Sequence, residues 1–514
     1  MRINSALRCG RGLSNWNGIL LPFAPTWTMR ALLILALVVA LARPAASGEL
    51  PVSVKPDTGH PGVVIPPDFA GLSFEVALVL PGPNGVHYFR PDNQPLLRLF
   101  RTLGIKSLRI GGNTSDRDAR QLPTEADLDS LFGFAQAAGV RVIYCLRLHN
   151  GDPQEDARVV KYILGRYPAQ VDCFSIGQEP SAYPVAKQDL RPNSERMGAA
   201  GEKYRYEDYR AEWKQFADAI RGAVPEVRFC GPSVHNNADW ARRFMADFAA
   251  SNQVALITEH LYPGGAGGKV PAPEIGRDRM LSADFLRVYQ RLHDGFVPLA
   301  QSNALPYRLE EVNNYFNGGA TNVSNTFASA LWGLDFMFWW AAHGAAGVNF
   351  HTGDRVAAGS SLQPSRYTAF YSTPDGYAVR PLGYGIKAFA LTGVGRLVPV
   401  VVSAPPELEL SAYAVSGPEG SLVVTLINKT HGASAPEARV TLTPDARFRS
   451  GKLLLLTAPK NDVSATTGVT LGGAEIQKDA GWNGEWRPIP PPDDGAFTCT
   501  LPPASAAVVK LDRQ

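Results

Sequence analysis

Two glutamates follow short apolar runs, at positions where a pair of carboxylates could act on one substrate. Glu179 lies in Ser175-Ile-Gly-Gln-Glu-Pro180, and Glu311 lies in Tyr307-Arg-Leu-Glu-Glu-Val312. In such a pair one carboxyl group protonates a departing oxygen and the other attacks carbon, which is what hydrolysis of a glycosidic bond requires. Because a single glutamate at a strand end can equally form a structural ion pair, the prediction depends on both glutamates reaching the same place.

The elements that must position these glutamates form a regular alternation. Short apolar runs typical of buried strands occupy residues 70–74, 106–110, 141–146, 171–176, 227–230, 255–258, 307–309 and 347–350. Most of them are separated by amphipathic helical patterns. The clearest of these starts at the N-cap Thr124, has Asp127 three residues later and ends at Gly139.

Eight strand–helix units favour an α/β protein built on a closed (β/α)8 TIM barrel over an open doubly wound sheet. No GxGxxG or Walker loop follows the first apolar run, which disfavours a nucleotide-binding fold. The active sites of such barrels lie at the carboxyl ends of the strands. Glu179 follows the fourth run and Glu311 the seventh, so both are expected at the same mouth of the barrel.

A second domain is predicted after the barrel. Beyond Phe389 the helical periodicity is absent, and the runs at 397–402, 421–427, 439–442, 452–456 and 506–511 are typical of strands in an all-β sandwich. We therefore assign residues 66–385 to the barrel and residues 386–514 to the sandwich. The short apolar pieces Val52–Val54 and Val63–Val64 are expected to bring residues 49–65 into the sandwich as well.

Residues 1–48 have the features of a leader. Met29-Arg30 precedes the apolar run Ala31–Ala42, and small residues follow, which is the pattern of a secretory signal peptide with translation starting at Met29. The alternative is a membrane anchor, but the run is shorter than the roughly 20 residues that span a bilayer. The mature chain is expected to be secreted, periplasmic or extracellular, without stable membrane insertion.

Composition narrows the choice of partners. The 514 residues are 45% hydrophobic and 19% charged, with 50 basic against 47 acidic side chains and no basic run, so a nucleic-acid surface is not expected. Cys9 falls in the leader, and the other cysteines lack metal-ligand spacing, so neither a metal nor another cofactor is expected. These others are expected as buried thiols, with a disulfide left open: Cys145, Cys173, Cys230 and Cys499.

Five motifs, in chain order, resemble those of glycoside hydrolase family 79, which contains heparanases and bacterial and fungal β-glucuronidases. They are Gly71-Leu-Ser-Phe-Glu75, Leu108-Arg-Ile-Gly-Gly-Asn113, Ile176-Gly-Gln-Glu-Pro180, His260-Leu-Tyr262 and Leu309-Glu-Glu-Val-Asn-Asn-Tyr-Phe-Asn-Gly-Gly319. The resemblance implies a retaining hydrolase of β-glucuronides, exo-acting or heparanase-like, that works by double displacement through a covalent glycosyl-enzyme. Glu179 would be the acid/base and Glu311 the nucleophile, with Glu310 as the competing assignment.

The resemblance also implies a set of residues that bind the carbohydrate. Glu75 would bind a sugar hydroxyl, Tyr262 would hydrogen-bond the nucleophile, and Gln178 would meet the 2-hydroxyl where the clan usually has asparagine. The other residues implied near the substrate are Arg109, Asn113, His260, Asn317, Gly318 and Tyr367, the last three around a sugar carboxylate. Where the family often has a tyrosine, this chain has Phe316, which cannot donate a hydrogen bond, so Tyr315 or Arg366 is expected to replace that donor.

The proposed chemistry sets expectations for ionisation. Glu179 should hold its proton near neutral pH, and Glu311 should stay ionised beside Arg109. Purely structural roles stay open for Glu75, Arg109 and His260, as does the choice between exo and endo cleavage. Two other functions stay open: a neutral-sugar retaining β-glycosidase of the same clan, and a non-catalytic carbohydrate-binding protein.

Overall fold

The computed structural model of the protein describes residues 48–116, 121–183, 204–251, 254–354, 364–393, 395–490 and 495–513. The expected signal peptide, with Met29 and Cys9, lies outside these ranges. Within them, no helix has both the length and the apolar character needed to cross a membrane.

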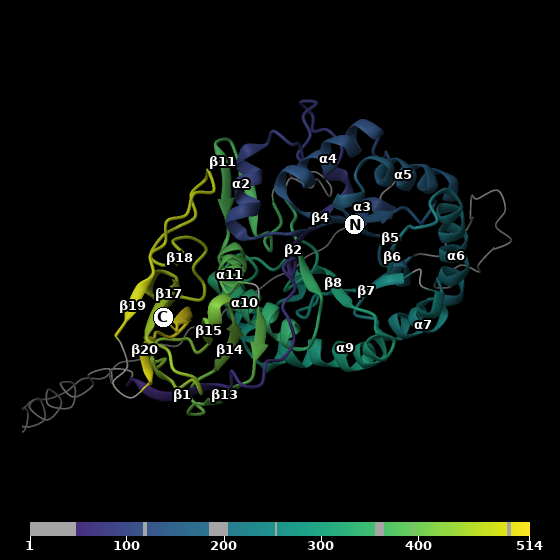
Figure 1. The fold of residues 1–514 in the computed structure, drawn as a ribbon. Helices are drawn as coiled ribbons and strands as arrows, with labels where there is room; N and C mark the ends of the chain where they lie inside the picture. Colours follow the sequence, from purple (N-terminus) through teal and green to yellow (C-terminus); the bar gives the residue numbers. More distant parts are fainter. Residues whose placement is uncertain are drawn as a thin grey trace, which may run out of the picture. The chain divides into compact units, whose positions relative to one another are not determined.

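Eight parallel strands form a closed barrel and follow one another around it in chain order (Figure 1). They are β2 Ala70–Glu75, β3 Ser107–Gly111, β4 Arg141–Leu146, β5 Val171–Ile176, β6 Phe229–His235, β7 Val254–Leu261, β8 Tyr307–Val312 and β9 Gly347–His351. β2 and β9 close the ring through pairs such as Leu72 with Phe350. The predicted α/β TIM barrel is confirmed, and each apolar run of the sequence coincides with one of these strands.

The strands β6, β7 and β8 extend beyond the apolar runs that predicted them. β7 continues through Glu259 and His260, and β8 continues through Glu310 and Glu311. The apolar pattern stops there because side chains near the barrel mouth are polar, although the backbone stays extended. The sequence pattern therefore marks the inner part of each strand and stops short of the end that carries the chemistry.

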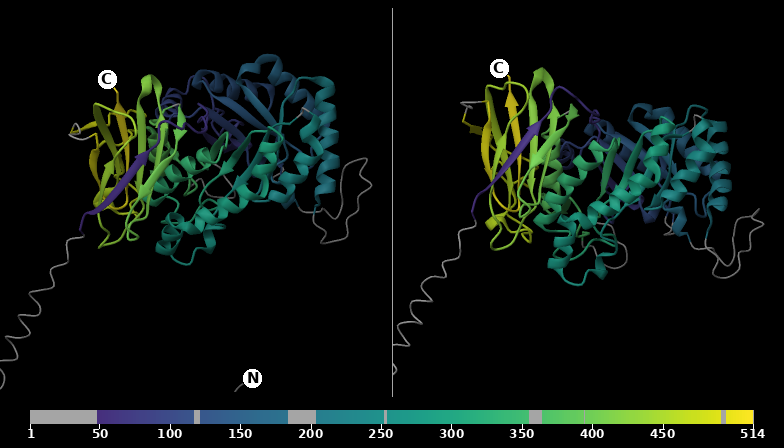
Figure 2. Two further views of the ribbon diagram at one scale, coloured as in Figure 1. Left: turned by 60° about the horizontal axis from the view of Figure 1, so that its bottom comes forward. Right: turned by 90° about the horizontal axis from the view of Figure 1, so that it is seen from below.

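Helices lie on the outer side of the barrel strands (Figure 2). The α-helices are α2 Gln94–Leu103, α3 Asn113–Asp116, α4 Glu125–Ala138, α5 Pro153–Arg166, α6 Tyr206–Ala223, α7 Ala238–Phe248, α8 Pro273–Leu281, α9 Ala283–Ser302, α10 Phe327–Ala342 and α11 Pro381–Ala390. The 3-10 turns are η1 Val76–Leu78, η2 Pro168–Gln170, η3 Pro180–Ala182, η4 Ala249–Ser251, η5 Gly267–Lys269, η6 Pro418–Gly420 and η7 Pro459–Asn461. The predicted capping of α4 is present: the amide of Thr124 donates to Asp127 Oδ2 at 2.8 Å, and Gly139 ends the helix with φ 67°.

Two mainly antiparallel sheets form the sandwich, most of which follows the barrel in the chain. One has the strand order β13-β1-β16-β20, and the other has the order β12-β14-β15-β21-β17-β18, with β19 paired to β17. Their strands are β12 Arg396–Val398, β13 Val400–Ser403, β14 Leu410–Ser416, β15 Leu422–Asn428, β16 Ala438–Leu442, β17 Ser450–Thr457, β18 Thr470–Leu471, β19 Arg487–Ile489, β20 Phe497–Leu501 and β21 Ser505–Asp512. A separate hairpin, β10 Phe370–Thr373 with β11 Gly376–Val379, stands between β9 and α11.

The strand β1, Leu50–Pro56, belongs to the sandwich although it precedes the barrel. It pairs antiparallel with β13 and parallel with β16, and Figure 1 shows it in purple along the lower edge of the sandwich, next to β13. The side chains of Val52 and Val54 are buried in the sandwich core. Val64 then bridges to Arg396, at the start of β12.

Apolar and polar contacts join the barrel to the sandwich. α11 runs to Ala390, five residues past the boundary assigned at 385, and the ring of Phe338 in α10 stacks 4.8 Å from that of Tyr413 in β14. Asp335 of α10 accepts hydrogen bonds of 2.8 Å from Tyr413 and Lys429 of the sandwich. The described cysteines are buried free thiols: Cys145, Cys173, Cys230 and Cys499.

Candidate active site

A cavity of about 620 Å³ opens at the carboxyl ends of the barrel strands. Its volume lies within the roughly 300–1,000 Å³ of typical ligand sites. The residues expected from the sequence that line it are Glu75, Asn113, Glu179, Tyr262, Glu311, Asn317, Gly318 and Tyr367. The other lining residues are Ala182, His235, Phe316, His351, Gly353, Pro364, Ser365 and Arg366.

A β-bulge decides which of two adjacent glutamates reaches this cavity. β7 and β8 pair Glu259 with Leu309 and then His260 with Glu311, so Glu310 is the extra residue on β8. A bulge of this kind re-aims the side chains around it. Glu311 lines the cavity, whereas Glu310 is fully buried in the barrel and does not.

Three donors hold the carboxylate of Glu311. Arg109 NH1 lies 2.6 Å from its Oε2, Gln178 Nε2 lies 3.1 Å from the same oxygen, and the hydroxyl of Tyr262 donates to Oε1 at 2.8 Å. Burial alone would raise the pKa of Glu311, but the charges of His351, His260 and Arg109 and the Tyr262 hydrogen bond hold that pKa well below its usual range. Glu311 is therefore an ionised carboxylate at neutral pH.

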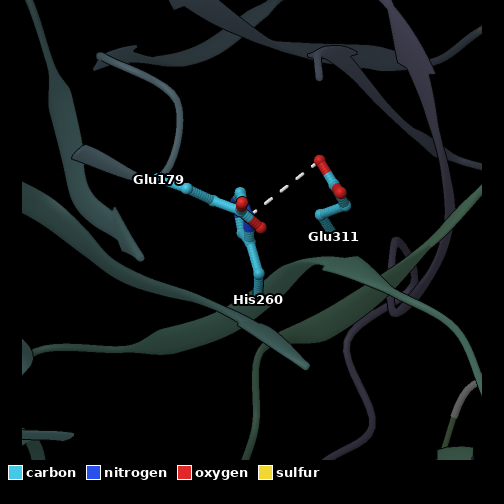
Figure 3. A group of neighbouring side chains, drawn as sticks. All are labelled: Glu179, His260 and Glu311. Carbon is cyan, nitrogen blue, oxygen red and sulfur yellow. Dashed lines mark hydrogen bonds and ion pairs between the residues drawn. The ribbon is translucent and has the colours of Figure 1, made fainter. Parts of the chain in front are cut away.

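Glu179 enters the cavity from the turn after β5. Its backbone has the left-handed conformation φ 46°, ψ 56°, and its amide donates to Ser233 O at 2.9 Å. A non-glycine residue in this region costs about 1–3 kcal/mol, so the surrounding contacts must hold it there. Oε1 of Glu179 lies 3.1 Å from His260 Nδ1, and Figure 3 shows both side chains reaching toward Glu311.

His260 lies among three glutamates. Burial lowers its pKa, but Glu311 and hydrogen bonds to Glu179 and Glu310 outweigh that effect and raise the pKa to about 9. The imidazole is therefore a cation at neutral pH and supplies positive charge between Glu179 and Glu311.

Glu179, His260 and Glu311 are the one group of side chains in the described part of the chain that is arranged so that it could hold a metal ion. One donor atom each from Glu179, His260 and Glu311 lie within 4.8 Å of one another. In this structure the Glu179–His260 hydrogen bond and the His260–Glu311 ion pair hold the three side chains together.

Glu75 is held by the chain that follows β3. Its oxygens accept from the Thr114 amide at 2.8 Å, the Thr114 hydroxyl at 2.6 Å and the Asn113 amide at 3.2 Å. Burial raises its pKa, but His351, whose Nε2 lies 3.6 Å away, and Thr114 lower it by more. Glu75 is thus an ionised hydrogen-bond acceptor at the edge of the cavity.

Arg109, Gln178 and His260 lie behind the cavity wall, which fits the structural roles left open for Arg109 and His260 and differs from the 2-hydroxyl contact expected of Gln178. Arg109 and His260 have no exposed surface and Gln178 is 1% exposed, and none of them lines the cavity. The Gln178 amide instead connects Arg109, which donates to its Oε1, with Glu311. The extra methylene of glutamine lets this side chain reach the nucleophile candidate rather than the cavity.

A short loop with a left-handed backbone borders the cavity, and Asn317 and Gly318 of this loop line it. Asn317, Gly318 and Gly319 follow one another with positive φ values of 58°, 78° and 84°. Within the described ranges, no acceptor lies within hydrogen-bond distance of these three amides. Successive amides freed in this way form a concave binding place for an anion.

Of the two residues suggested as the replacement donor, Tyr315 does not line the cavity. Its hydroxyl donates to Gly276 O at 2.9 Å, and its ring packs 5.5 Å from Phe285, away from the cavity. Phe316 lines the cavity instead, with its ring 5.6 Å from His235. Arg366, the other suggested donor, does line the cavity.

Sequence reasoning missed two histidines of the cavity. His351 ends β9, with Nδ1 3.0 Å from Ser73 Oγ and 3.9 Å from Glu311. His235 ends β6 in the same way. The signal that could have found them is a polar residue at the end of a barrel strand, the same signal that found Glu75.

Comparisons with known proteins agree with this arrangement. No family model matches the chain. It is 25% identical over 374 residues to a β-glucuronidase of Aspergillus niger, a match that covers 66% of this chain and spans 66% of that enzyme's length. The resemblance predicted from the motifs is therefore confirmed, and the chain is β-glucuronidase-like in sequence.

Solved structures match the fold. A 4-O-α-L-rhamnosyl-β-D-glucuronidase of Fusarium oxysporum 12S, solved with Rha-GlcA, superposes with a TM-score of 0.68 at 17% identity over 90% of this chain and 100% of that one. A family 51 arabinofuranosidase of Xanthomonas axonopodis pv. citri reaches a TM-score of 0.62 at 14% identity, again over 90% and 100%. Barrel and sandwich together are therefore a fold that known glycosidases use.

Proposed function

We propose that this β-glucuronidase homologue is a retaining hydrolase of β-linked glucuronides, with Glu179 as acid/base and Glu311 as nucleophile. The observation that carries the proposal is the proximity of these two carboxylates, which have an oxygen pair within 4.8 Å in one cavity. Retaining enzymes hold their carboxyl groups about 5–5.5 Å apart, whereas inverting enzymes need roughly 6.5–9.5 Å to admit a water. The short separation favours direct attack by one carboxylate.

In the first step Glu311 attacks the anomeric carbon while Glu179 protonates the departing oxygen. A covalent glycosyl-enzyme forms and the negative charge of Glu311 is consumed. In the second step Glu179 removes a proton from water, the water oxygen bonds to the anomeric carbon, and Glu311 leaves as a carboxylate. Arg109, His260 and Tyr262 support this cycle because they stabilise Glu311 in its ionised form.

The loop from Asn317 to Gly319 supports a uronate in the cleavage site. Asn317 and Gly318 of this loop line the cavity, and Tyr367 and Arg366 line the same space. A sugar carboxylate would satisfy these donors, whereas a neutral hydroxymethyl group would leave some of them unpaired. Each buried donor left unpaired costs about 1–3 kcal/mol.

The test is hydrolysis of aryl β-glycosides. An aryl β-glucuronide should exceed the matching β-glucoside in kcat/KM by at least about a hundredfold, since two unpaired donors suffice for that factor. NMR of the first-formed sugar should show the β anomer. Equal rates on the two substrates would instead indicate a neutral-sugar glycosidase, and an α product would exclude the double displacement.

One variant and one covalent probe separate catalysis from binding. Glu179→Gln should lower kcat by about 10²–10⁴-fold on substrates with poor leaving groups, because they need the acid most. A 2-fluoro glucuronyl probe should label Glu311, and fragmentation of the peptide distinguishes it from Glu310. Binding of glucuronate without turnover of any aryl glycoside would identify a non-catalytic carbohydrate-binding protein.

We propose further that the leader exports the enzyme. Mass spectrometry of the mature amino terminus from the native host tests this.

A further inference from the structure

A second cavity, of about 380 Å³, lies beside the catalytic cavity and shares a wall with it. The loop before α10, the hairpin β10–β11 and the start of α11 line it on the barrel side. Residues 466–469 and 475–478 of the sandwich line the opposite side. Its volume also falls within the roughly 300–1,000 Å³ of ligand sites.

Arg380 forms the shared wall. Its NH1 donates to the carbonyl oxygens of Ser365 at 2.7 Å and Arg366 at 2.8 Å, two residues that line the catalytic cavity. Arg380 itself lines the second cavity, where its guanidinium lies 4.9 Å from the ring centre of Tyr371. The guanidinium of Arg380 thus holds backbone carbonyls in the wall of the catalytic cavity and also lines the second cavity.

The charge of Arg380 lacks an acidic partner. Among the described residues, no carboxylate lies within ion-pair distance of it, and its Nε and NH2 have no hydrogen-bond acceptor. Burial lowers its pKa most, Arg366 lowers it further, and Tyr371 and the more distant carboxylate of Asp354 raise it by less. A partly buried guanidinium with two free donors in one plane suits a bidentate anion such as a carboxylate or a sulfate.

Other polar groups line the cavity near this guanidinium. Oδ1 of Asn325 is buried without a hydrogen-bond partner, and the exposed side chains of Thr466 and Thr467 line the opposite side. At the rim Glu475 is exposed, and the ammonium group of Lys478 is paired with Asp375 at 2.8 Å. Sugars have hydroxyls that donate and accept, and apolar C–H faces that pack on aromatic rings, so these groups match a saccharide.

We propose that the second cavity is an accessory binding site for an acidic sugar. The carboxylate or sulfate group of that sugar binds Nε and NH2 of Arg380, its ring packs beside Tyr371, and Asn325 binds a ring hydroxyl. The site goes beyond the hydrolytic function and does not depend on it, because no group of the catalytic cavity takes part in the binding.

Calorimetric titration of the full chain tests the proposal. The probes are a tetrasaccharide containing glucuronate, the same tetrasaccharide with its carboxyl groups reduced, and a sulfated neutral tetrasaccharide. We expect at least one acidic probe to bind a site that the reduced probe does not, and the two acidic probes tell a carboxylate from a sulfate. Absence of such a site for both acidic probes overturns the proposal.

Two variants locate the site. Tyr371→Ala and Asn325→Ala should each weaken it by about tenfold, or about 1.4 kcal/mol, and leave kcat/KM on an aryl glucuronide unchanged, since neither residue lines the catalytic cavity. Arg380→Lys, which keeps the charge and loses the bidentate geometry, should weaken binding as well. Acidic-probe binding that none of the three variants alters overturns the proposal. Binding at this site without cleavage of aryl glucuronides would contradict the proposed function alone.

Discussion

Arg109 and Glu311 form an ion pair of 2.6 Å inside the barrel, with the guanidinium fully buried and the carboxylate at the cavity surface. The pair links the second barrel strand to the seventh. Removing one partner of a buried pair leaves an uncompensated charge, which typically costs about 3–5 kcal/mol.

Arg109→Met should therefore lower the free energy of unfolding in urea by about 3–5 kcal/mol and reduce kcat. The double variant Arg109→Met, Glu311→Gln should lose less than the sum of the single variants, by about 0.5–3 kcal/mol. Lys214→Met, which breaks the exposed pair with Asp218, is the matched control and should leave the urea midpoint unchanged. Strict additivity in the double variant would mean that the pair does not couple the strands.

Tyr262→Phe removes the 2.8 Å hydrogen bond to Oε1 of Glu311. This bond helps to hold the pKa of Glu311 down, so its loss should raise that pKa and move the acid limb of the kcat/KM profile to higher pH. A hydrogen bond to a charged group contributes about 1.5–3 kcal/mol, so kcat/KM should fall by about 10–150-fold.

Tyr315→Phe is the control for Tyr262→Phe. It removes the hydroxyl that donates to Gly276 O, away from the cavity. The variant should cost about 1 kcal/mol of stability and leave the acid limb in place. A shift of the acid limb in Tyr315→Phe would instead indicate that Tyr315 acts in the cavity.

Gln178→Ala distinguishes two roles for the residue before Glu179. If its amide acts on Glu311, as its 3.1 Å contact indicates, the loss in kcat should be the same on 2-hydroxy and 2-deoxy substrates. If the amide binds the sugar 2-hydroxyl, the loss should shrink on the 2-deoxy substrate. We expect equal losses of about 2–4 kcal/mol, with Gln178→Met as the variant that keeps the volume.

His260 should make stability depend on pH. Its pKa of about 9 in the folded protein, against 6.5 in the unfolded chain, means that the folded state binds the proton more tightly. The stability gained is fully present below pH 6.5 and is lost as pH rises through about 9, by roughly 3 kcal/mol at about 1.4 kcal/mol per pKa unit. Urea unfolding between pH 6 and 10 measures it, and His260→Asn should flatten the decline.

A second histidine gives the control of opposite sign. Burial lowers the pKa of His343, so the folded protein binds this proton less tightly than the unfolded chain does. His343 therefore costs stability only as the pH drops below 6.5. His343→Asn should therefore keep the decline between pH 6.5 and 9. If His260→Asn and His343→Asn changed that decline equally, His260 would not be its source.

The strands and the two glutamates were predictable because their signals are local. Apolar runs of three to six residues mark the barrel strands, and Glu179 and Glu311 follow such runs within three residues. Barrel geometry then brings strand ends together without further information. The capping of α4 by Thr124 and Asp127 was predictable for the same reason.

The direction of side chains beyond a strand end was not predictable. Whether Tyr315 or Phe316 faces the cavity depends on the turn after β8, where Asn314 and Asn313 bond to neighbouring backbone and Asn317 has positive φ. Gln178 was assigned to the sugar because the sequence cannot show that Arg109 and Glu311 lie within its reach. Such contacts depend on residues far apart in the chain.

The place of β1 has consequences for folding and for proteolysis. It lies between β13 and β16, from which the whole barrel separates it in the chain. Bringing such distant segments together is slow and entropically costly, so this sheet should be completed late, and β13 and β16 should present unpaired edges until then. The chain also crosses between the two domains twice, once before β2 and once after α11. A single cut at either crossing would therefore leave barrel and sandwich joined by the other.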